Sequence, residues 1–313
     1  MPASRHLAFA AAVTALCAGP AAHAALLDLA APIGGANVYA IKNFTSSGSD
    51  TEGAIVAGGN VTLSGYRVND KNKDAFSNYS VVAGGNVNMS NGNIVNGLTY
   101  AGGTITAPNW ALDGVSTVKP IDFKATESYY KTLSSALDKL ANTGTVTGGA
   151  GTSYVSGSGK GGVDIFDVSG NIFQTSKEWK LSNLVPGQTL IFNVSGSSGS
   201  FADNNIEFAS LSGYNVLFNF YEATSVDVRS VIGSILAPYA TVSKNSGNVN
   251  GTVIVDTWNS TVQINTNGFK AVEVAGLNLG TSTPPSTAVP EPASIALVLG
   301  GLAAFGLARR RKP

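Results

Sequence analysis

One short stretch recurs along the chain at a fixed interval, and this repeat limits the possible folds more than any other feature. "AIVAGGNVTLS" begins at residue 54 and "SVVAGGNVNMS" at residue 80; the two align without a gap, and a looser copy, "YAGGTITA", starts at Tyr100. "IFDVSG" at residue 165 returns as "IFNVSG" at residue 191 and as "LFNF" at residue 217, with the same offset each time. Periods of about 20–50 residues are typical of stacked structural units.

Each repeated unit has the composition of a β-strand. Its core is β-branched or aromatic and is bounded by Gly, Asn and Ser. Alternation places Val61 and Leu63 on one face, with Val87 and Met89 of the next copy above or below them. We therefore expect a mainly β protein, a parallel β-solenoid (β-helix).

The glycine pairs set the corners of this predicted solenoid. Gly58-Gly59 and Gly84-Gly85 are expected where the backbone needs positive φ or close approach, with Asn60 and Asn86 following in register. The shared offset also predicts that the three "AGG" segments lie on adjacent parallel strands. The same holds for Phe166, Phe192 and Phe218.

The segment from residue 120 to residue 142 breaks the pattern, because it contains no glycine and has a helical period. Asp122 is a suitable N-cap. The predicted apolar stripe consists of Ile121, Ala125, Tyr129, Leu133, Ala136, Leu137 and Leu140. We expect one amphipathic α-helix packed along the flank of the solenoid.

Residues 1–24 have the features of a secretory signal peptide: a basic start, an apolar run and the small-x-small sequence "AHA". Signal peptidase is expected to cut between Ala24 and Ala25. A retained N-terminal anchor is the alternative. The cut removes Cys17, His6 and His23, the only Cys and His residues of the chain. This excludes disulfides, thiol nucleophiles, Ser-His-Asp devices and His- or Cys-ligated metals in the mature protein.

The C-terminal end has the composition of a linker followed by a sorting signal. Residues 280–289 are rich in Pro, Ser and Thr, and residues 290–313 hold an uncharged, mostly apolar run, Ala293 to Ala308, a helix of about 24 Å. Arg309, Arg310, Arg311 and Lys312 follow and indicate the cytoplasmic side of a membrane.

With the triplet Pro290-Glu291-Pro292, this tail resembles the PEP-CTERM sorting signal. The resemblance implies transient anchoring in the inner membrane and cleavage near the triplet by an exosortase-type enzyme. A plain C-terminal membrane anchor is the alternative, but it does not account for the triplet.

Charge excludes one class of partner. The chain carries 19 basic and 19 acidic residues, and five of the basic ones lie in the two end segments. The mature body is therefore mildly acidic, and no nucleic-acid partner is expected.

Two pairs of carboxylates are candidates for catalysis. Asp164 and Asp167 have the character of a glycosidase carboxylate pair, but Asp167 aligns with Asn193 and Asn219, which favours a structural ladder. Asp50 and Glu52 are a second near pair, on a loop rich in Ser and Gly.

Asp70, Asn72 and Asp74 begin like a calcium loop, but Ala75 and Val81 replace the Gly and Glu of an EF-hand. An irregular calcium site stays open here, as it does for "DNNIE" at residues 203–207. We predict no other metal and no cofactor.

Aromatic residues are candidates for an exposed sugar-stacking platform. These are Trp110, Trp179, Trp258, Tyr66, Tyr79 and Tyr239. Trp179, placed among charges in "SKEWKLS", is expected to be the most exposed of them. The alternative is that most of them cap the solenoid or pack under loops.

Residues 37–68, the "PIDF" that opens the helix, and residues 233–256 resemble the choice-of-anchor A domain. The likeness extends roughly from residue 36 to residue 279, so we assign residues 25–279 to this domain. It implies an exported bacterial surface protein and supplies no catalytic residues. Residues 233–256 are also faintly similar to a coil of the β-solenoid ice-binding proteins, but the Thr residues of "TIT" (104–106) and "TVT" (145–147) are isolated.

The sequence thus predicts a non-enzymatic, structural or adhesive protein of the cell surface or extracellular matrix. Its expected partners are signal peptidase, an exosortase-type enzyme, and a matrix polysaccharide or surface protein. The alternatives are a polysaccharide-active enzyme on the same scaffold and an ice-binding protein.

Overall fold

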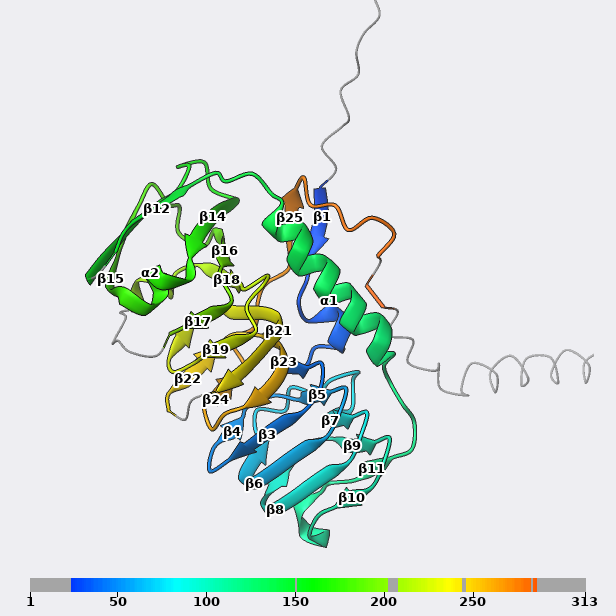
Figure 1. Ribbon diagram of the computed structural model, residues 1–313. Coiled ribbons are helices and arrows are strands. Elements are labelled where there is room, and N and C mark those ends of the chain that lie inside the picture. Colours follow the sequence, from blue (N-terminus) through cyan, green and yellow to red (C-terminus); the bar gives the residue numbers. More distant parts are fainter. Residues whose placement is uncertain (1–23, 150, 202–207, 244–245, 283, 286–313) are drawn as a thin grey trace, which may run out of the picture.

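The computed structural model describes residues 24–285, except residues 150, 202–207, 244–245 and 283 (Figure 1). Within this part of the chain, 20 strands form one sheet in which every pairing is parallel. The prediction of a mainly β fold with parallel pairing is confirmed.

The strands stack in three parallel ladders, named here the first, second and third ladder. The first ladder runs, from one end of the molecule to the other, through β14 (Val163–Ser169), β16 (Thr189–Ser195), β18 (Asn215–Asn219), β21 (Ser234–Ser243), β23 (Val253–Asn259), β2 (Val38–Ala40), β5 (Ile55–Ala57), β7 (Tyr79–Ala83), β9 (Leu98–Ala101) and β11 (Val115–Ser116).

The second ladder runs through β17 (Ser198–Ser200), β19 (Ser225–Asp227), the later parts of β21 and β23, then β3 (Phe44–Ser47), β6 (Val61–Val68), β8 (Val87–Ile94) and β10 (Ile105–Thr106). The third runs through β20 (Val231–Ile232), β22 (Asn248–Asn250), β24 (Gln263–Asn265), β4 (Asp50–Thr51) and the later parts of β6 and β8.

The order of strands in space differs from their order in the chain. The chain enters the stack in the middle, at β2, and proceeds to one end at β11. Helix α1 (Phe123–Asp138) then runs back along the molecule, and the second half of the stack begins at the opposite end with β14 (Figure 1). The two halves meet where β23 pairs with β2.

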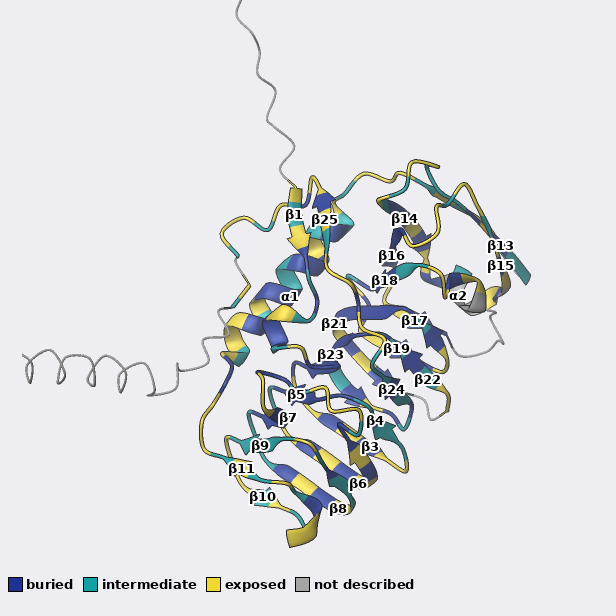
Figure 2. Ribbon diagram, turned by 180° about the vertical axis from the view of Figure 1, so that it is seen from behind, coloured by how far each residue is buried: buried dark blue, intermediate teal, exposed yellow. Residues whose placement is uncertain are grey.

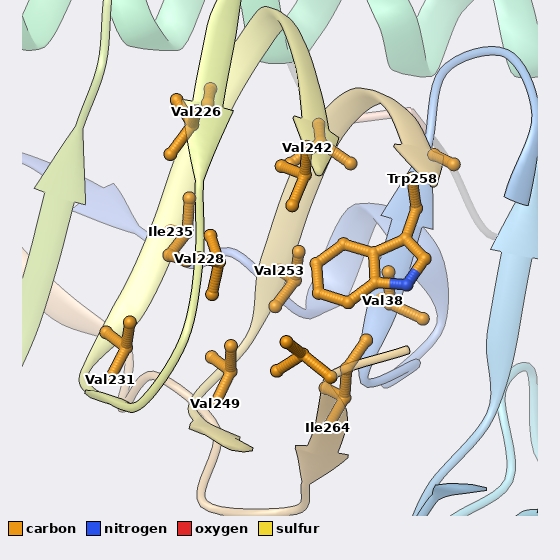
Figure 3. Packing of buried hydrophobic residues seen from close by; sticks show 14 of the residues in the cluster. Val38, Val226, Val228, Val231, Ile235, Val242, Val249, Val253, Trp258 and Ile264 are labelled. Carbon is orange, nitrogen blue, oxygen red and sulfur yellow. The ribbon is translucent and has the colours of Figure 1, made fainter. Parts of the chain in front are cut away.

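Apolar side chains from both halves close this junction. Val38 of β2 lies beside Val253 and Trp258 of β23 (Figure 3), and all three are fully buried. The ring of Trp258 stacks on Phe44 of β3, with ring centroids 6.0 Å apart. One hydrophobic core therefore continues through the whole stack.

The predicted neighbours of the repeats are confirmed. Phe166 pairs with Phe192 and Phe192 with Phe218 in the first ladder, and the three "AGG" segments lie on β5, β7 and β9. The phenylalanine rings stack at 4.9 and 5.3 Å between centroids. Copies separated by 26 residues therefore pair in the same way in both halves of the molecule, and the third "AGG" copy pairs with the second at the shorter interval from Ala83 to Ala101.

The glycine corners are confirmed as sites of close backbone approach rather than of positive φ. A Cβ atom on Gly58 would clash with the carbonyl oxygen of Ile41, and one on Gly84 would clash with that of Gly58. None of the four corner glycines, Gly58, Gly59, Gly84 and Gly85, has positive φ. Each turn of the stack therefore lies directly against the previous one.

Helix α1 covers the outer face of the first ladder. Its side chains Tyr129, Leu133 and Leu137 are buried as predicted, and Asp122 caps the helix by accepting from the amides of Lys124 and Ala125. Ala125 is exposed, contrary to the predicted stripe, and Tyr130 is buried in its place. Both faces of this ladder are thus buried, which is why its strands are almost continuously apolar.

Smaller elements complete the fold. β12 (Thr145–Gly148), β13 (Gly151–Ser156) and β15 (Ser176–Ser182) form a sheet over the β14 end, where a second short helix, α2 (Gly170–Thr175), was not predicted. β1 (Ala24–Leu27) and β25 (Val272–Ala275) pair antiparallel beside α1 (Figure 1). Short 3-10 turns lie at Ala31–Ile33, Asn109–Ala111 and Phe208–Leu211.

No helix among the described residues is both long enough and apolar enough to cross a membrane. The membrane helix predicted for Ala293 to Ala308 lies outside the described residues.

Candidate functional site

The side of the second ladder that faces away from the core carries a regular surface of uncharged polar residues. Along β3, β6 and β8, buried and exposed residues alternate, as the banding in Figure 2 shows. In β6, Val61 and Leu63 point into the core, while Thr62 and Ser64 face solvent. Alternate residues of the strand thus pack in the core and face solvent.

Because the strands are in register, the exposed residues form rows. The first, called here the threonine row, consists of Asn259, Thr45, Thr62, Asn88 and Thr106. The second, called the serine row, consists of Ser47, Ser64 and Ser90. Strand spacing sets neighbours in a row about 4.8 Å apart, and the two-residue step along a strand separates the rows by about 6.7 Å.

The second half of the stack adds a shorter set on the same ladder. Ser225 pairs with Thr241, and Thr241 with Thr257, in β19, β21 and β23. Ser225 and Thr241 are exposed, and Thr257 is partly exposed. Hydroxyl groups therefore line this face on both sides of the junction between the halves.

A ladder of asparagine side chains fixes the corner beside the rows. The Oδ1 atom of Asn43 accepts from the amide of Asn60, that of Asn60 accepts from the amide of Asn86, and that of Asn86 accepts from the amide of Thr104, each at 2.8 Å. The predicted register of Asn60 and Asn86 is confirmed, and Asn43 and Thr104 extend it. The backbone beside the rows is therefore held by hydrogen bonds between consecutive turns of the stack.

Chemically, the rows offer hydrogen-bond donors and acceptors at a fixed repeat and no ionisable group. A hydroxyl or amide can both donate and accept. Such a surface suits a partner that is itself rich in hydroxyl groups or ordered water.

The carboxylates proposed as a glycosidase pair are held on opposite sides of β14. Asp164 is buried and accepts from Thr143 Oγ1, Ser158 N and Gln188 Nε2 at 2.8, 3.0 and 2.8 Å. Asp167 is exposed and accepts from Asn142 Nδ2 at 2.7 Å. Desolvation by burial alone would raise the pKa of Asp164, but these hydrogen bonds outweigh it, and its pKa is lowered.

The aligned residues Asn193 and Asn219 bind helix α1, as a structural ladder would. Asn193 donates to the carbonyl of Leu137 at 2.8 Å, and Asn219 donates to the carbonyl of Ser134 and to Asn193 Oδ1, both at 2.9 Å. The polar position of the repeat therefore ties the first ladder to the helix.

Asp50 and Glu52 lie at the third ladder, and the predicted loop is wrong for Asp50, which lies in strand β4. Asp50 accepts from Gln263 Nε2 at 3.0 Å, and Glu52 accepts from Thr266 N at 2.8 Å. Burial and the nearby charge of Asp70 raise the pKa of Asp50. Both carboxylates thus join β4 and the residue after it to β24 and the turn that follows β24.

The calcium candidates lie in a turn organised by Asn69. Asn69 donates to Asp74 Oδ1 at 2.6 Å and accepts from the amide of Lys73 at 2.6 Å, and Asp70 lies 3.8 Å from Lys71 Nζ. Asn72 sits in the same turn at a positive φ of 54°. Within the described residues there is no group of three or more His, Cys, Asp or Glu placed to hold a metal ion. "DNNIE" at residues 203–207 lies outside them.

The predicted aromatic platform is not assembled. The expectation for Trp179 is wrong: it is 3% exposed and packs edge-on against Phe192, because β15 folds over the end of the core. Trp258, Tyr66 and Tyr79 are buried as well, and only Trp110 and Tyr239 of the six are exposed. These two lie at different places, in the 3-10 turn Asn109–Ala111 and in β21.

The predicted processing residues fall mostly outside the described chain. Ala24 and Ala25 begin β1, where they pair with Ala275 and Val274. Pro290, Glu291, Pro292 and the arginines at 309–311 lie outside the described residues, so both cleavage predictions stay predictions.

The rows were missed at the sequence level, although part of their signal was present. The repeat offset that aligns Val61 with Val87 also aligns Thr62 with Asn88 and Ser64 with Ser90. Thr45 precedes Thr62 by a shorter interval than this offset, so its place in the row follows from the structure alone. Thr106 of "TIT" belongs to the row and is not isolated, whereas "TVT" lies in β12, in a different sheet.

Residues 30–266 match the family described as "Putative Ice-binding-like adhesive domain". The chain belongs to this family. Residues 288–312 match the PEP-CTERM protein-sorting motif, in agreement with the predicted tail. Neither a curated protein nor a solved structure matches the chain.

Proposed function

We propose that this protein is an exported bacterial adhesin or matrix component whose contact surface is formed by the threonine and serine rows. In this proposal the three ladders form a parallel β-solenoid, with α1 sealing one flank and the second ladder left free. The adhesive family and the sorting motif support export to the surface. The resemblance to the choice-of-anchor A domain is consistent with the same role.

The observation that carries this proposal is the register of the rows. Thr45, Thr62, Asn88 and Thr106 are exposed on four consecutive strands of the second ladder. Thr also suits an exposed strand position on structural grounds, so the shared register of these residues over four strands, and not their type alone, supports the proposal. A repeated surface can bind a repeated partner with many weak hydrogen bonds at once.

Sorting follows from the two ends of the chain. In our proposal, signal peptidase cuts between Ala24 and Ala25, and the C-terminal segment holds the protein in the inner membrane. An exosortase-type enzyme then cuts near Pro290-Glu291-Pro292 and releases the body to the cell surface or matrix. The linker at 280–289 keeps the cut away from the folded body.

We further propose that the protein is not an enzyme and needs no cofactor. Asp164 and Asp167 face opposite sides of β14, and each accepts hydrogen bonds from neighbouring side chains. Asp50 and Glu52 also accept hydrogen bonds from neighbouring residues. A glycosidase needs two carboxyl groups facing one substrate. Release of reducing sugar from common polysaccharides by the purified protein, lost in Asp164→Asn or Asp50→Asn, would refute this part of the proposal.

Ice binding is the second candidate, because hydroxyl groups spaced at regular intervals on a flat sheet face could also order water. The mixture of Thr with Asn and Ser in the rows favours adhesion to a hydroxyl-rich solid over ice. Measurement of ice recrystallisation with the wild-type protein decides between the two, and inhibition at micromolar protein would favour ice.

The adhesion test uses cells that display the full chain. Thr62→Arg places a long, charged side chain in the middle of the threonine row, and we expect it to reduce attachment of these cells to their own extracted matrix by about tenfold. Thr145→Arg makes the same change at an exposed threonine of β12, outside the rows, and should leave attachment unchanged. Equal attachment by both variants would refute the rows as the contact surface.

A further inference from the structure

A chain of adjacent hollows borders the C-terminal segment, residues 267–278, on the side of the molecule away from the rows. The first, of about 390 Å³, lies between α1, Tyr239 and Asn278. The second, of about 510 Å³, shares Lys139, Leu140 and Gly276 with the first. We call these hollows and their two continuations the C-terminal furrow.

The furrow continues past the second hollow. A third hollow of about 450 Å³ shares Gly162 and Val272 with the second, and a fourth of about 480 Å³ shares Asn215 and Lys270 with the third. Four shallow hollows in sequence are the shape expected for an extended polymer, whereas a small molecule is usually enclosed in a single deep pocket.

Lysine side chains lie along the furrow. Lys131 lies with its Nζ atom 5.3 Å from the centre of the Tyr239 ring and pairs with Glu127. Lys139 and Lys270 are exposed, and neither forms an ion pair with any residue that the structure describes. Lys131 and Lys139 are eight positions apart along α1 and its C-cap, which separates them by about 12 Å along the helix axis.

This local charge is opposite to that of the body. Of the 19 acidic residues only Glu291 lies beyond residue 279, whereas five of the 19 basic residues lie in the two end segments, so the folded body is acidic. The residues that line the four hollows nevertheless include three lysines and one carboxylate, that of Glu273. On an acidic protein, a lysine-lined furrow favours an anionic ligand over a neutral one.

Uncharged hydrogen-bonding groups stand between the lysines. Thr132 and Ser135 of α1 and Asn278 of the C-terminal segment line the first hollow together with the exposed ring of Tyr239. Asn215 and Asn250 line the fourth. The furrow therefore combines spaced positive charges with neutral donors and acceptors, as a polymer with both carboxylate and hydroxyl groups requires.

We propose that the C-terminal furrow binds a strand of acidic polysaccharide built from uronic-acid units. The carboxylates pair with Lys139 and Lys270, and with Lys131 beside its partner Glu127, and the sugar hydroxyls bind Thr132, Ser135 and Asn278. This site lies on the side of α1, so it is separate from the threonine and serine rows. The proposal adds a second ligand class to an adhesive protein and does not depend on the rows being correct.

The experiment measures binding of polygalacturonate oligosaccharides to the purified full chain by titration calorimetry at low salt. Lys139→Gln and Lys270→Gln each remove one charge-assisted contact, and we expect each to weaken binding by about tenfold. Lys124→Gln, on the same helix but outside the furrow, is the matched control and should bind like the wild type. All three lysines are exposed, so none of these changes should disturb folding.

Fully methyl-esterified polygalacturonate provides the second arm, because it keeps the sugar and loses the charge. We expect it to bind at least about tenfold more weakly than the acid form. Absence of binding to the acid form, equal binding of the ester, or equal loss in Lys124→Gln would each overturn the proposal. Thr62→Arg should leave this binding unchanged, which separates failure of the furrow from failure of the rows.

Discussion

The two halves of the stack, residues 38–116 and residues 163–265, both contain the 26-residue repeat but are stabilised by different chemistry. In the first half most core residues are aliphatic, such as Val61, Leu63 and Val87, although Phe44 and Tyr66 are also buried there, and the tight corners come from glycine. In the second half Phe166, Phe192 and Phe218 stack along the core. An equal spacing in the sequence therefore indicates the same strand pairing, but it does not indicate the same side-chain packing in the core.

Asparagine also serves different ends in the two halves. Asn60 and Asn86 accept from backbone amides at a solvent-exposed corner and join one turn to the next. Asn193 and Asn219 are buried and donate to the carbonyls of α1. The exposed asparagines of the first half thus join turns of the stack to one another, whereas the buried ones of the second half join the stack to α1.

The largest expected effect is at the centre of the aromatic stack. Phe192→Ala removes a fully buried ring between Phe166 and Phe218 and should lower the free energy of unfolding by about 3–5 kcal/mol. Leu63→Ala, in the aliphatic core of the first half, is the comparison and should cost less. Denaturant unfolding of both variants checks the difference, and a greater loss for Leu63→Ala would contradict the contrast between the halves.

A methyl group at a corner of the first half should have the next largest effect. The added Cβ of Gly84→Ala meets the backbone carbonyl of Gly58, so two turns of the stack must move apart, at a cost of about 1–3 kcal/mol. Gly213→Ala has no heavy atom within 4 Å of its new Cβ and serves as the control. Thermal unfolding should separate the two, and equal melting temperatures would show that the corner is loose.

The tie between the second half and α1 should contribute less. Asn219→Ala removes the hydrogen bonds to Ser134 and Asn193 and should cost about 1–2 kcal/mol. The same change at Asn60 leaves a backbone amide that water can reach, so it should cost less. Hydrogen exchange of the α1 amides should be faster in Asn219→Ala alone, and unchanged exchange would mean that apolar contacts hold the helix.

The smallest effect is expected on the free face. Thr62→Ala alters an exposed residue with no core contact and should change the free energy of unfolding by no more than about 0.5 kcal/mol. A loss of attachment in this variant at unchanged stability would assign the row to recognition. A loss of more than about 2 kcal/mol would make Thr62 a structural residue instead.

The sequence predicts the pairings between copies of the 26-residue repeat, because repeated strands with the same core residues make the same contacts. It does not predict how the halves join. "NVYAIKNF" and "TVIVDTWN" pair as β2–β3 and β23, yet they share no motif, and no offset links them. The two segments fit together through buried side chains: Val38 pairs with Val253, and Phe44 stacks on Trp258.

The surroundings of two candidate groups also depend on packing in space. Trp179 is flanked by Lys177 and Lys180, which indicates exposure, but β15 crosses the end of the core and buries it. The carboxylates at 164 and 167 are close in sequence, but an odd separation on a strand places them on opposite faces. A residue's neighbours in the chain are poor guides where its neighbours in space come from another turn of the stack.

The chain enters the stack in its middle, at β2, and this places Asn259 of β23 beside Thr45 of β3. Because the mature body has no cysteine, the double variant Asn259→Cys and Thr45→Cys can be cross-linked with a short bifunctional thiol reagent. The account predicts rapid intramolecular cross-linking of this pair. It predicts none for Asn259→Cys with Thr106→Cys, which stand four strands apart, roughly 19 Å. Cross-linking of the second pair and not of the first would show that the halves stack in another order, and would contradict the account.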